Sequence, residues 1–115
     1  MHELSIADAI VRIAEAYAQG RRVRRVDVKV GHLRQVVPSA LGFAFELLAA
    51  GTAMEGAELV LVEVPARVGC HRCAAESPVD GFPLVCRRCG GFDVEVLQGE
   101  ELYVDSLEVE ETAVV

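Results

Sequence analysis

The sequence predicts an α+β fold in which two helices pack on a small three-stranded mixed sheet and a cysteine-rich segment is inserted before the last strand. Two segments repeat apolar residues every three or four positions, as helices do, and three others have the apolar patterns of strands. Between Pro65 and Val96 glycine, proline, cysteine and charged residues replace this periodicity. We therefore expect an α/β domain made of residues 1–66 plus 97–115, and a separate inserted domain at 67–96.

The first helix is expected to begin at about Glu3, almost at the amino terminus, and to end at Gly20. Its apolar positions fall on one stripe, which we expect to face the core: Leu4, Ala7, Val11, Ala14 and Ala18.

A second helix is predicted to begin at Pro38, because proline suits the first helical position, and to end before Gly51. Its apolar stripe consists of Leu41, Ala44, Phe45 and Leu48.

Four arginines follow the first helix: Arg21, Arg22, Arg24 and Arg25. We interpret them as a solvated junction in preference to a binding patch.

Three strands complete the predicted α/β domain. Val26, Val28 and Val30 alternate with charged residues, which is the period of a strand with one buried face. Residues 59–64 are apolar on both faces, so we expect a central strand covered on both sides. In the last strand the apolar phase changes at residues 105–106, which indicates a bulge.

Charge and hydropathy exclude several classes of protein. The formal net charge of -7 disfavours a nucleic-acid partner, because proteins usually meet phosphate backbones with a basic face. The longest apolar run, residues 59–62, is far shorter than the roughly 20 residues that cross a bilayer. The amino terminus lacks the basic start of a signal peptide, so we expect a cytoplasmic protein without a membrane partner.

Two Cys-x-x-Cys pairs, Cys70 with Cys73 and Cys86 with Cys89, are the strongest chemical signal in the chain. Each pair can turn two thiolates toward one point, and two such knuckles complete a tetrahedral zinc site with zinc–sulfur distances of about 2.3 Å. Four thiolates leave no open position for water, so a structural or regulatory zinc is expected and a catalytic one is not. A pair of disulfides and a rubredoxin-like iron site are the alternatives.

The residues around the cysteines refine this prediction. Gly90 and Gly91 after the second pair permit the positive backbone angles and the close approach that such a knuckle uses, and Ala74 occupies the equivalent place in the first. His71 has two interpretations. It is either an exposed knuckle residue, or a side chain that titrates near pH 6.5 and acts as a hydrogen-bond donor to the zinc ligands or as an alternative ligand.

The amino terminus offers a second metal site. The free amine of Met1, the backbone nitrogen that follows and the imidazole of His2 can close adjoining chelate rings around one ion. Nitrogen-rich tetragonal coordination suits Ni(II) or Cu(II). The positive end of the helix dipole opposes a cation there, and Glu3 offsets it. Because the ligands must lose protons, such a site is pH-sensitive and can release its ion.

Several segments resemble the HypA/HybF family of hydrogenase maturation nickel chaperones. They are the opening MHELSIA, the VKVGHL strand end, EGAELVLVEVPA before the cysteine pairs, and the closing ELYVDSLEVE. The resemblance implies that a zinc domain is inserted into a nickel-binding domain. It maps nickel binding onto Met1, His2 and Glu3, and zinc binding onto Cys70, Cys73, Cys86 and Cys89. It further implies Ni(II) as transient cargo, Zn(II) as a structural ion, the HypB GTPase as a partner and delivery of nickel to the large subunit of nickel-iron hydrogenase.

These observations and the resemblance leave three classes of function, and they favour a non-enzymatic nickel metallochaperone. A zinc-ribbon protein-interaction module without a nickel role is the alternative. An enzyme ranks third, because the sequence shows no Ser-His-Asp arrangement, phosphate loop or open metal site. Whether the chain forms a homodimer stays open, and His32 is expected on the surface.

Overall fold

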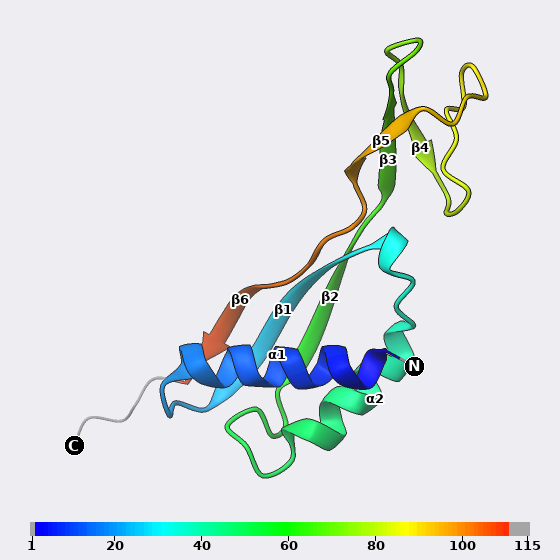
Figure 1. The fold of residues 1–115 in the computed structure, drawn as a ribbon. Coiled ribbons are helices and arrows are strands. Elements are labelled where there is room, and N and C mark those ends of the chain that lie inside the picture. The colour runs from blue at the N-terminus through cyan, green and yellow to red at the C-terminus, as the bar shows by residue number, and fades with distance from the viewer. Residues whose placement is uncertain (1, 111–115) are drawn as a thin grey trace. The chain divides into compact units, whose positions relative to one another are not determined.

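The fold was analysed in a computed structural model, which describes residues 2–110. The order of elements is α1 (Glu3–Ala18), β1 (Val23–Gly31), a 3-10 helix η1 (His32–Arg34), α2 (Pro38–Ala49), β2 (Glu58–Val64), β3 (Ala66–Cys70), β4 (Glu76–Val79), β5 (Val94–Gln98) and β6 (Leu102–Val109). The strands form two three-stranded sheets, ordered β2-β1-β6 and β4-β3-β5 (Figure 1). The α+β class and the first, mixed sheet are as predicted.

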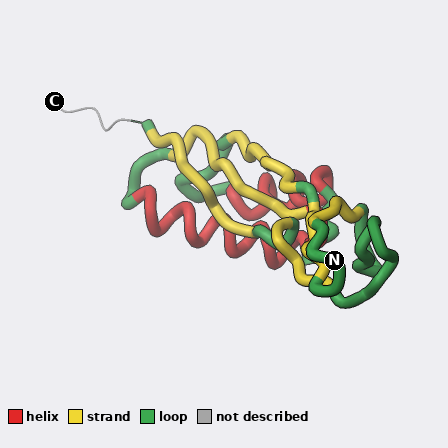
Figure 2. Tube along the Cα trace, turned by 90° about the horizontal axis from the view of Figure 1, so that it is seen from above, coloured by secondary structure: helices red, strands yellow, loops and turns green. Residues whose placement is uncertain are grey.

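The chain divides into two compact units. The helical unit comprises Met1–Val28, Val36–Val62 and Tyr103–Val115, and the ribbon unit comprises Lys29–Gln35 and Glu63–Leu102. Both helices lie on one face of the sheet β2-β1-β6 (Figure 2). None of the helices in the described part of the chain has the length and apolar character that spanning a membrane requires.

The two helices form where their patterns predict. In α1, Ala7, Val11, Ala14 and Ala18 are buried as expected, and the helix ends with Gln19 in the left-handed conformation before Gly20. The expectation for Leu4 is wrong, because its side chain is 56% exposed. Glu3 and Ile10 are buried in its place, which turns the buried stripe slightly around the helix axis.

Helix α2 begins at Pro38 as predicted and packs against α1. Its buried residues are Leu41, Ala44, Phe45 and Ala49, and Leu48 is half-buried. Phe45 and Leu41 are among the largest fully buried side chains of the chain, together with Met54 from the loop that follows α2.

Strand β1 is the centre of the first sheet. Val23, Val26, Val28 and Val30 are buried, which confirms the alternation predicted for this strand. The prediction that residues 59–64 form the central strand is wrong, because β2 lies at an edge and all its residues are half-buried or exposed. Although β2 is apolar on both faces, its side chains are only partly covered, because an edge strand has a neighbouring strand on one side only.

Strand β6 occupies the other edge of this sheet. Gly31 N donates to the carbonyl of Glu101, and Glu110 N donates to that of Arg22, so β6 runs antiparallel to β1. Asp105 and Ser106 are both exposed in a strand that otherwise alternates. The two hydrogen bonds keep the same register at both ends of β6, so the bulge at this place stays a prediction.

The ribbon unit has a small core of its own. One cluster of this core consists of the buried residues Leu33, Ala66, Val68 and Val79. Strand β3 is central and pairs antiparallel with β4 in a regular register. It also pairs antiparallel with β5, where the register shifts between Arg67 and Val68. Leu33 comes from η1, so a segment far from the cysteines contributes to the same core.

Candidate metal centres

The two cysteine pairs sit on two backbone turns of the same design. In the first, Cys70 N donates to the carbonyl of Ala75, and Ala74 N donates to that of Cys70. In the second, Cys86 N donates to the carbonyl of Gly91, and Gly90 N donates to that of Cys86. The repeat of hydrogen bonds confirms two equivalent knuckles.

The residue that closes each knuckle has a left-handed backbone. Gly90 has φ +74°, as its residue type permits, and Ala74 has φ +62° in spite of its Cβ. A Cβ on Gly91 would lie 3.3 Å from the sulfur of Cys89, so this glycine leaves room for the sulfur. The roles predicted for these positions are therefore confirmed.

The four sulfurs come together at one place. All four lie within 4.8 Å of one another, and the pairs Cys70–Cys89 and Cys73–Cys86 are each 3.6 Å apart. The cysteines are free thiols and form no disulfide. A tetrahedron with metal–sulfur bonds of about 2.3 Å has edges of about 3.8 Å, so the separations fit one tetrahedral ion.

The electrostatics of the cluster also fit a cation. Backbone N–H groups of Cys89 and Arg88 lower the pKa of Cys86 to about 6, and those of Cys73 and Arg72 lower the pKa of Cys70. For Cys73 the N–H of Ala75 acts in the same sense, but desolvation and the neighbouring sulfurs outweigh it and raise the pKa to about 11. Adjacent thiolates repel one another, so full ionisation of the cluster requires a bound positive ion.

His71 lies in the first knuckle and points both ring nitrogens at carboxylates. Nδ1 is 3.0 Å from Oδ1 of Asp93, and Nε2 is 3.7 Å from Oε1 of Glu95. The hydrogen bond with Asp93 and its negative charge raise the pKa of His71 above 6.5. The imidazole is about half-exposed, with 52% of its surface accessible. Sequence reasoning did not find Asp93 and Glu95, which are 22 and 24 residues away.

A buried serine supports the second knuckle. Ser77 on β4 is 6% exposed, and its Oγ accepts a hydrogen bond from the backbone N–H of Arg87, between the two cysteines of that pair. The side chain of Arg87 contacts Asp80, with 2.9 Å between Nη2 and Oδ2. Sequence analysis missed Ser77, because a lone serine in a short strand carries no local signal.

The second candidate centre is the start of α1. Met1 lies outside the described residues. His2 is the N-cap of the helix, and its carbonyl accepts hydrogen bonds from Ile6 N at 3.0 Å and from Ser5 Oγ at 2.9 Å. The backbone of His2 is thereby fixed by the first turn, while its imidazole remains about half-exposed.

Glu3 differs from an ordinary first-turn carboxylate because it is buried. Its side chain is 6% exposed and accepts a hydrogen bond from the backbone N–H of Val37, at the start of α2, at 3.1 Å. The charged amino terminus has the largest effect on its pKa and the N–H of Val37 the next, and they lower it to about 2. Glu3 is therefore ionised at neutral pH and lies 4.0 Å from Nε2 of His2.

Spacing along α1 contained a signal for this burial. Glu3 lies on the same helical stripe as Ala7, Ile10 and Ala14, all of which are buried.

The third histidine, His32, is exposed in η1, as expected.

Comparisons with known proteins agree with this architecture. The family model described as hydrogenase/urease nickel incorporation, metallochaperone, HypA matches residues 1–109. The hydrogenase maturation factor HypA of Geobacter metallireducens is 46% identical over 96% of this chain and its own full length. That of Streptomyces avermitilis is 46% identical over 96% of this chain and 88% of its own length.

Solved structures give the same result. The solution structure of the Ni metallochaperone HypA from Helicobacter pylori has a TM-score of 0.68 and 25% identity, and covers 95% of this chain and 97% of that one. A second solution structure of a HypA protein has a TM-score of 0.69 and 26% identity, and covers 96% and 97%. The match of the family model to nearly the whole sequence, with relatives that align from end to end, shows that this chain belongs to the HypA family of nickel-incorporation metallochaperones.

Proposed function

We propose that this chain binds Ni(II) at its amino terminus and delivers it to the large subunit of nickel-iron hydrogenase. The observation that carries the proposal is the placement of His2. Its backbone is held by the first turn of α1 while its imidazole stays half-exposed, so the side chain has a defined base and remains accessible to an ion.

The proposed ligands are the amine of Met1, the backbone nitrogen of His2 and its imidazole. The amide of His2 precedes the first residue that donates a helical hydrogen bond, so the helix does not use it. Three nitrogens in adjoining chelate rings favour Ni(II) or Cu(II).

Glu3 completes the proposed nickel site. The positive end of the α1 dipole disfavours a cation, and a carboxylate that is ionised down to a pH of about 2 offsets it. Because Glu3 also accepts from Val37 N, it fixes the start of α1 against the start of α2. Every nitrogen ligand must lose a proton before it binds nickel, so affinity falls in acid and the cargo can be released.

The four cysteines are proposed to hold a structural Zn(II). Sulfur separations of 3.6 Å, left-handed turns behind each pair and thiols of lowered pKa support this assignment. When bound, the ion supplies the positive charge that lets Cys70, Cys73, Cys86 and Cys89 ionise together. His71 is proposed to influence the cluster through its position in the first knuckle.

The proposed setting is the cytoplasm, with the HypB GTPase and the precursor of the hydrogenase large subunit as partners. The proposed role requires no catalysis, because the chain holds and passes on an ion. Relatives that are named hydrogenase maturation factors support a role in hydrogenase maturation.

Calorimetric titration with Ni(II) tests the proposal on the zinc-loaded chain. We expect one nickel per chain, and an affinity at least about tenfold lower for His2→Ala and for a chain with one glycine inserted after Met1, since each breaks the chelate. His32→Ala is the matched control, because it removes an exposed histidine outside this site. Equal affinity in all four proteins would eliminate the amino-terminal site and favour a zinc-ribbon interaction module without a nickel role.

A further inference from the structure

Strand β4 carries a polar side chain on its buried face. Burial alternates along the strand, so Ser77 and Val79 are buried while Glu76 and Pro78 are exposed. Val79 belongs to the apolar core of the ribbon unit, and Ser77, which is 6% exposed, brings a hydroxyl to the same face of the strand. A buried hydroxyl lowers stability unless a hydrogen bond compensates it, so the partner of Ser77 indicates what this serine does.

The partner of Ser77 is the backbone of the second knuckle. The Oγ atom accepts a hydrogen bond from Arg87 N at 3.3 Å, ten residues farther along the chain. Arg87 directly follows Cys86, a buried cysteine of the cluster. The next two amides, those of Arg88 and Cys89, donate to the sulfur of Cys86. Ser77 therefore satisfies the amide at the point where the chain enters the knuckle, and the sulfur satisfies the two that follow.

The first knuckle anchors its equivalent amide in a different way. His71 has the place that Arg87 has in the second knuckle, and its backbone N–H donates to the main-chain carbonyl of Asp93 at 3.0 Å. A main-chain acceptor is present whatever side chain occupies position 93. The second knuckle depends on a side chain for the same bond, so a substitution of Ser77 removes the acceptor.

An ion pair forms a second link between this knuckle and the segment that follows β4. Nη2 of Arg87 lies 2.9 Å from Oδ2 of Asp80. The two side chains are 53% and 94% exposed, and exposed ion pairs contribute little to stability. The hydrogen bond to the buried Ser77 is therefore the stronger link, because water competes less for its acceptor.

We propose that Ser77 is a positioning residue for the zinc site, which holds the second knuckle in the orientation that turns Cys86 and Cys89 toward the ion. The inference rests on the proposed binding of zinc by the four cysteines. The sulfurs that lie 3.6 Å apart come from different knuckles, so a shift of the second knuckle changes both of these separations. Ser77 acts through the backbone of Arg87 and is not itself a ligand.

Alkylation of the zinc-loaded chain by iodoacetamide tests this assignment. A sulfur that is bound to zinc shares its electron pair with the ion and reacts slowly, so the first cysteine to be labelled is one that leaves the ion. Tandem mass spectrometry of chains with a single label identifies that cysteine. In Ser77→Ala we expect the two cysteines of the second knuckle to react about tenfold faster than in the wild type, because the amide of Arg87 has lost its acceptor. The two cysteines of the first knuckle should change by less than about twofold.

Two further variants separate the hydroxyl from the shape of the side chain. Threonine and valine have nearly the same shape, and only threonine has a hydroxyl. An added methyl group disturbs the packing around position 77 equally in both, so their comparison isolates the hydrogen bond. The second knuckle should react about tenfold more slowly in Ser77→Thr than in Ser77→Val.

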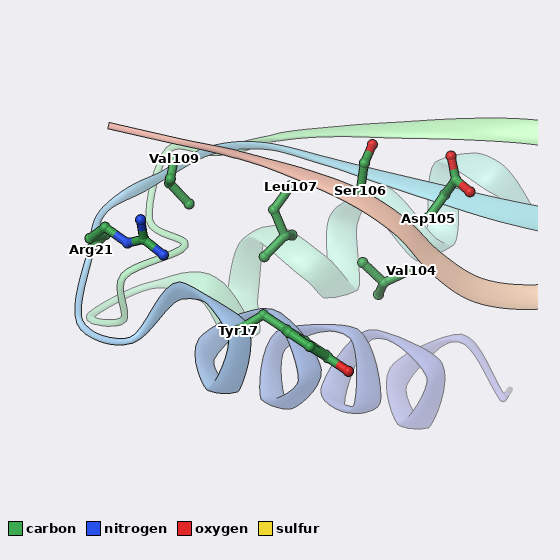
Figure 3. A pocket seen from close by; sticks show the side chains of 7 residues that line it. All are labelled: Tyr17, Arg21, Val104, Asp105, Ser106, Leu107 and Val109. Atoms are coloured by element: carbon green, nitrogen blue, oxygen red, sulfur yellow. The ribbon is translucent and has the colours of Figure 1, made fainter. Parts of the chain in front are cut away.

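Ser106→Ala is the matched control, because it removes a serine hydroxyl that does not contact a knuckle. Figure 3 shows Ser106 on the side of β6 away from α1, and its Oγ donates to Oδ2 of Asp27 at 2.8 Å. This variant should leave the labelling rates of all four cysteines unchanged.

Three outcomes would overturn the inference and leave the proposed zinc site intact. The first is a zinc-loaded Ser77→Ala variant with the labelling rates of the wild type. The second is an equal rise at all four cysteines, which would show a general loosening of the ribbon unit. The third is equal rates in Ser77→Thr and Ser77→Val. A wild-type chain that takes up no zinc would overturn the proposed zinc site together with this inference.

Discussion

Loss of the buried ligand Cys86 tests most directly how the ribbon unit is stabilised. Cys86 is 1% exposed and contributes the thiol whose pKa is lowered to about 6. In Cys86→Ser a hydroxyl replaces that thiol, and a serine hydroxyl does not ionise near neutral pH. We expect zinc content to fall well below one ion per chain.

The size of the effect follows from the small core of the unit. Three larger apolar side chains are buried there, Leu33, Val68 and Val79, beside the small Ala66. At about 1.5–3 kcal/mol each, the larger three contribute about 5–9 kcal/mol. A complete zinc site in a short finger contributes about 10–16 kcal/mol. The half-buried Leu84, Val94 and Val96 add to this core, so the metal and the apolar core contribute comparable free energies, and loss of the metal should open the whole unit.

Hydrogen exchange read by mass spectrometry measures this opening segment by segment. Amides of β3, β4 and η1 should lose their protection in Cys86→Ser, because η1 supplies Leu33 to the same core. Amides of α1 and of residues 23–28 belong to the helical unit and should keep theirs. Arg88→Ser is the matched control, since Arg88 is exposed in the same knuckle. Unchanged protection after loss of zinc, or parallel unfolding of α1, would refute the reasoning.

Four other perturbations have defined outcomes. Because the pKa of Cys73 is about 11, zinc displaces one proton from this thiol when it binds at neutral pH. In a competition assay, this group alone should make the zinc affinity rise about tenfold per pH unit between about pH 7 and 9. By NMR titration, His71 should have a pKa above 6.5, which Asp93→Asn should lower and Asp80→Asn should leave unchanged. The stability that protonated His71 contributes is present below about pH 6.5 and is lost as the pH rises through its folded-state pKa. Gly31→Ala should destabilise the fold by at least about 1–3 kcal/mol in urea unfolding, since its Cβ would collide with the carbonyl of Gly99, whereas Gly42→Ala meets open space and should not destabilise α2. Phe45→Ala should cost about 3–5 kcal/mol, and Phe43→Ala, at a position that is 64% exposed, less than about 1 kcal/mol.

Features that depend on neighbouring residues could be predicted from the sequence. The period of apolar residues located α1, α2 and β1, because each pattern reflects the geometry of one element. The change of phase in β6 located the two successive exposed residues Asp105 and Ser106 for the same reason. The cysteine spacing predicted two knuckles, and the hydrogen bonds within each of them span at most five residues.

Features that depend on distant neighbours required the tertiary structure. The composition of residues 59–64 suited a central strand, yet β2 became an edge strand because β1 pairs with β6 on its other side. The partners of His71 on β5 and in the preceding loop, and the hydrogen bond from Val37 to Glu3, join residues 22 to 34 positions apart. Leu33 likewise entered the core of the ribbon unit from η1. The sequence alone thus determined the helices, the valine strand β1 and the pairing of the cysteines in two knuckles. Only the tertiary structure decided the order of the strands and the surroundings of each metal site, because pairing and burial depend on which distant segments the folded chain brings together.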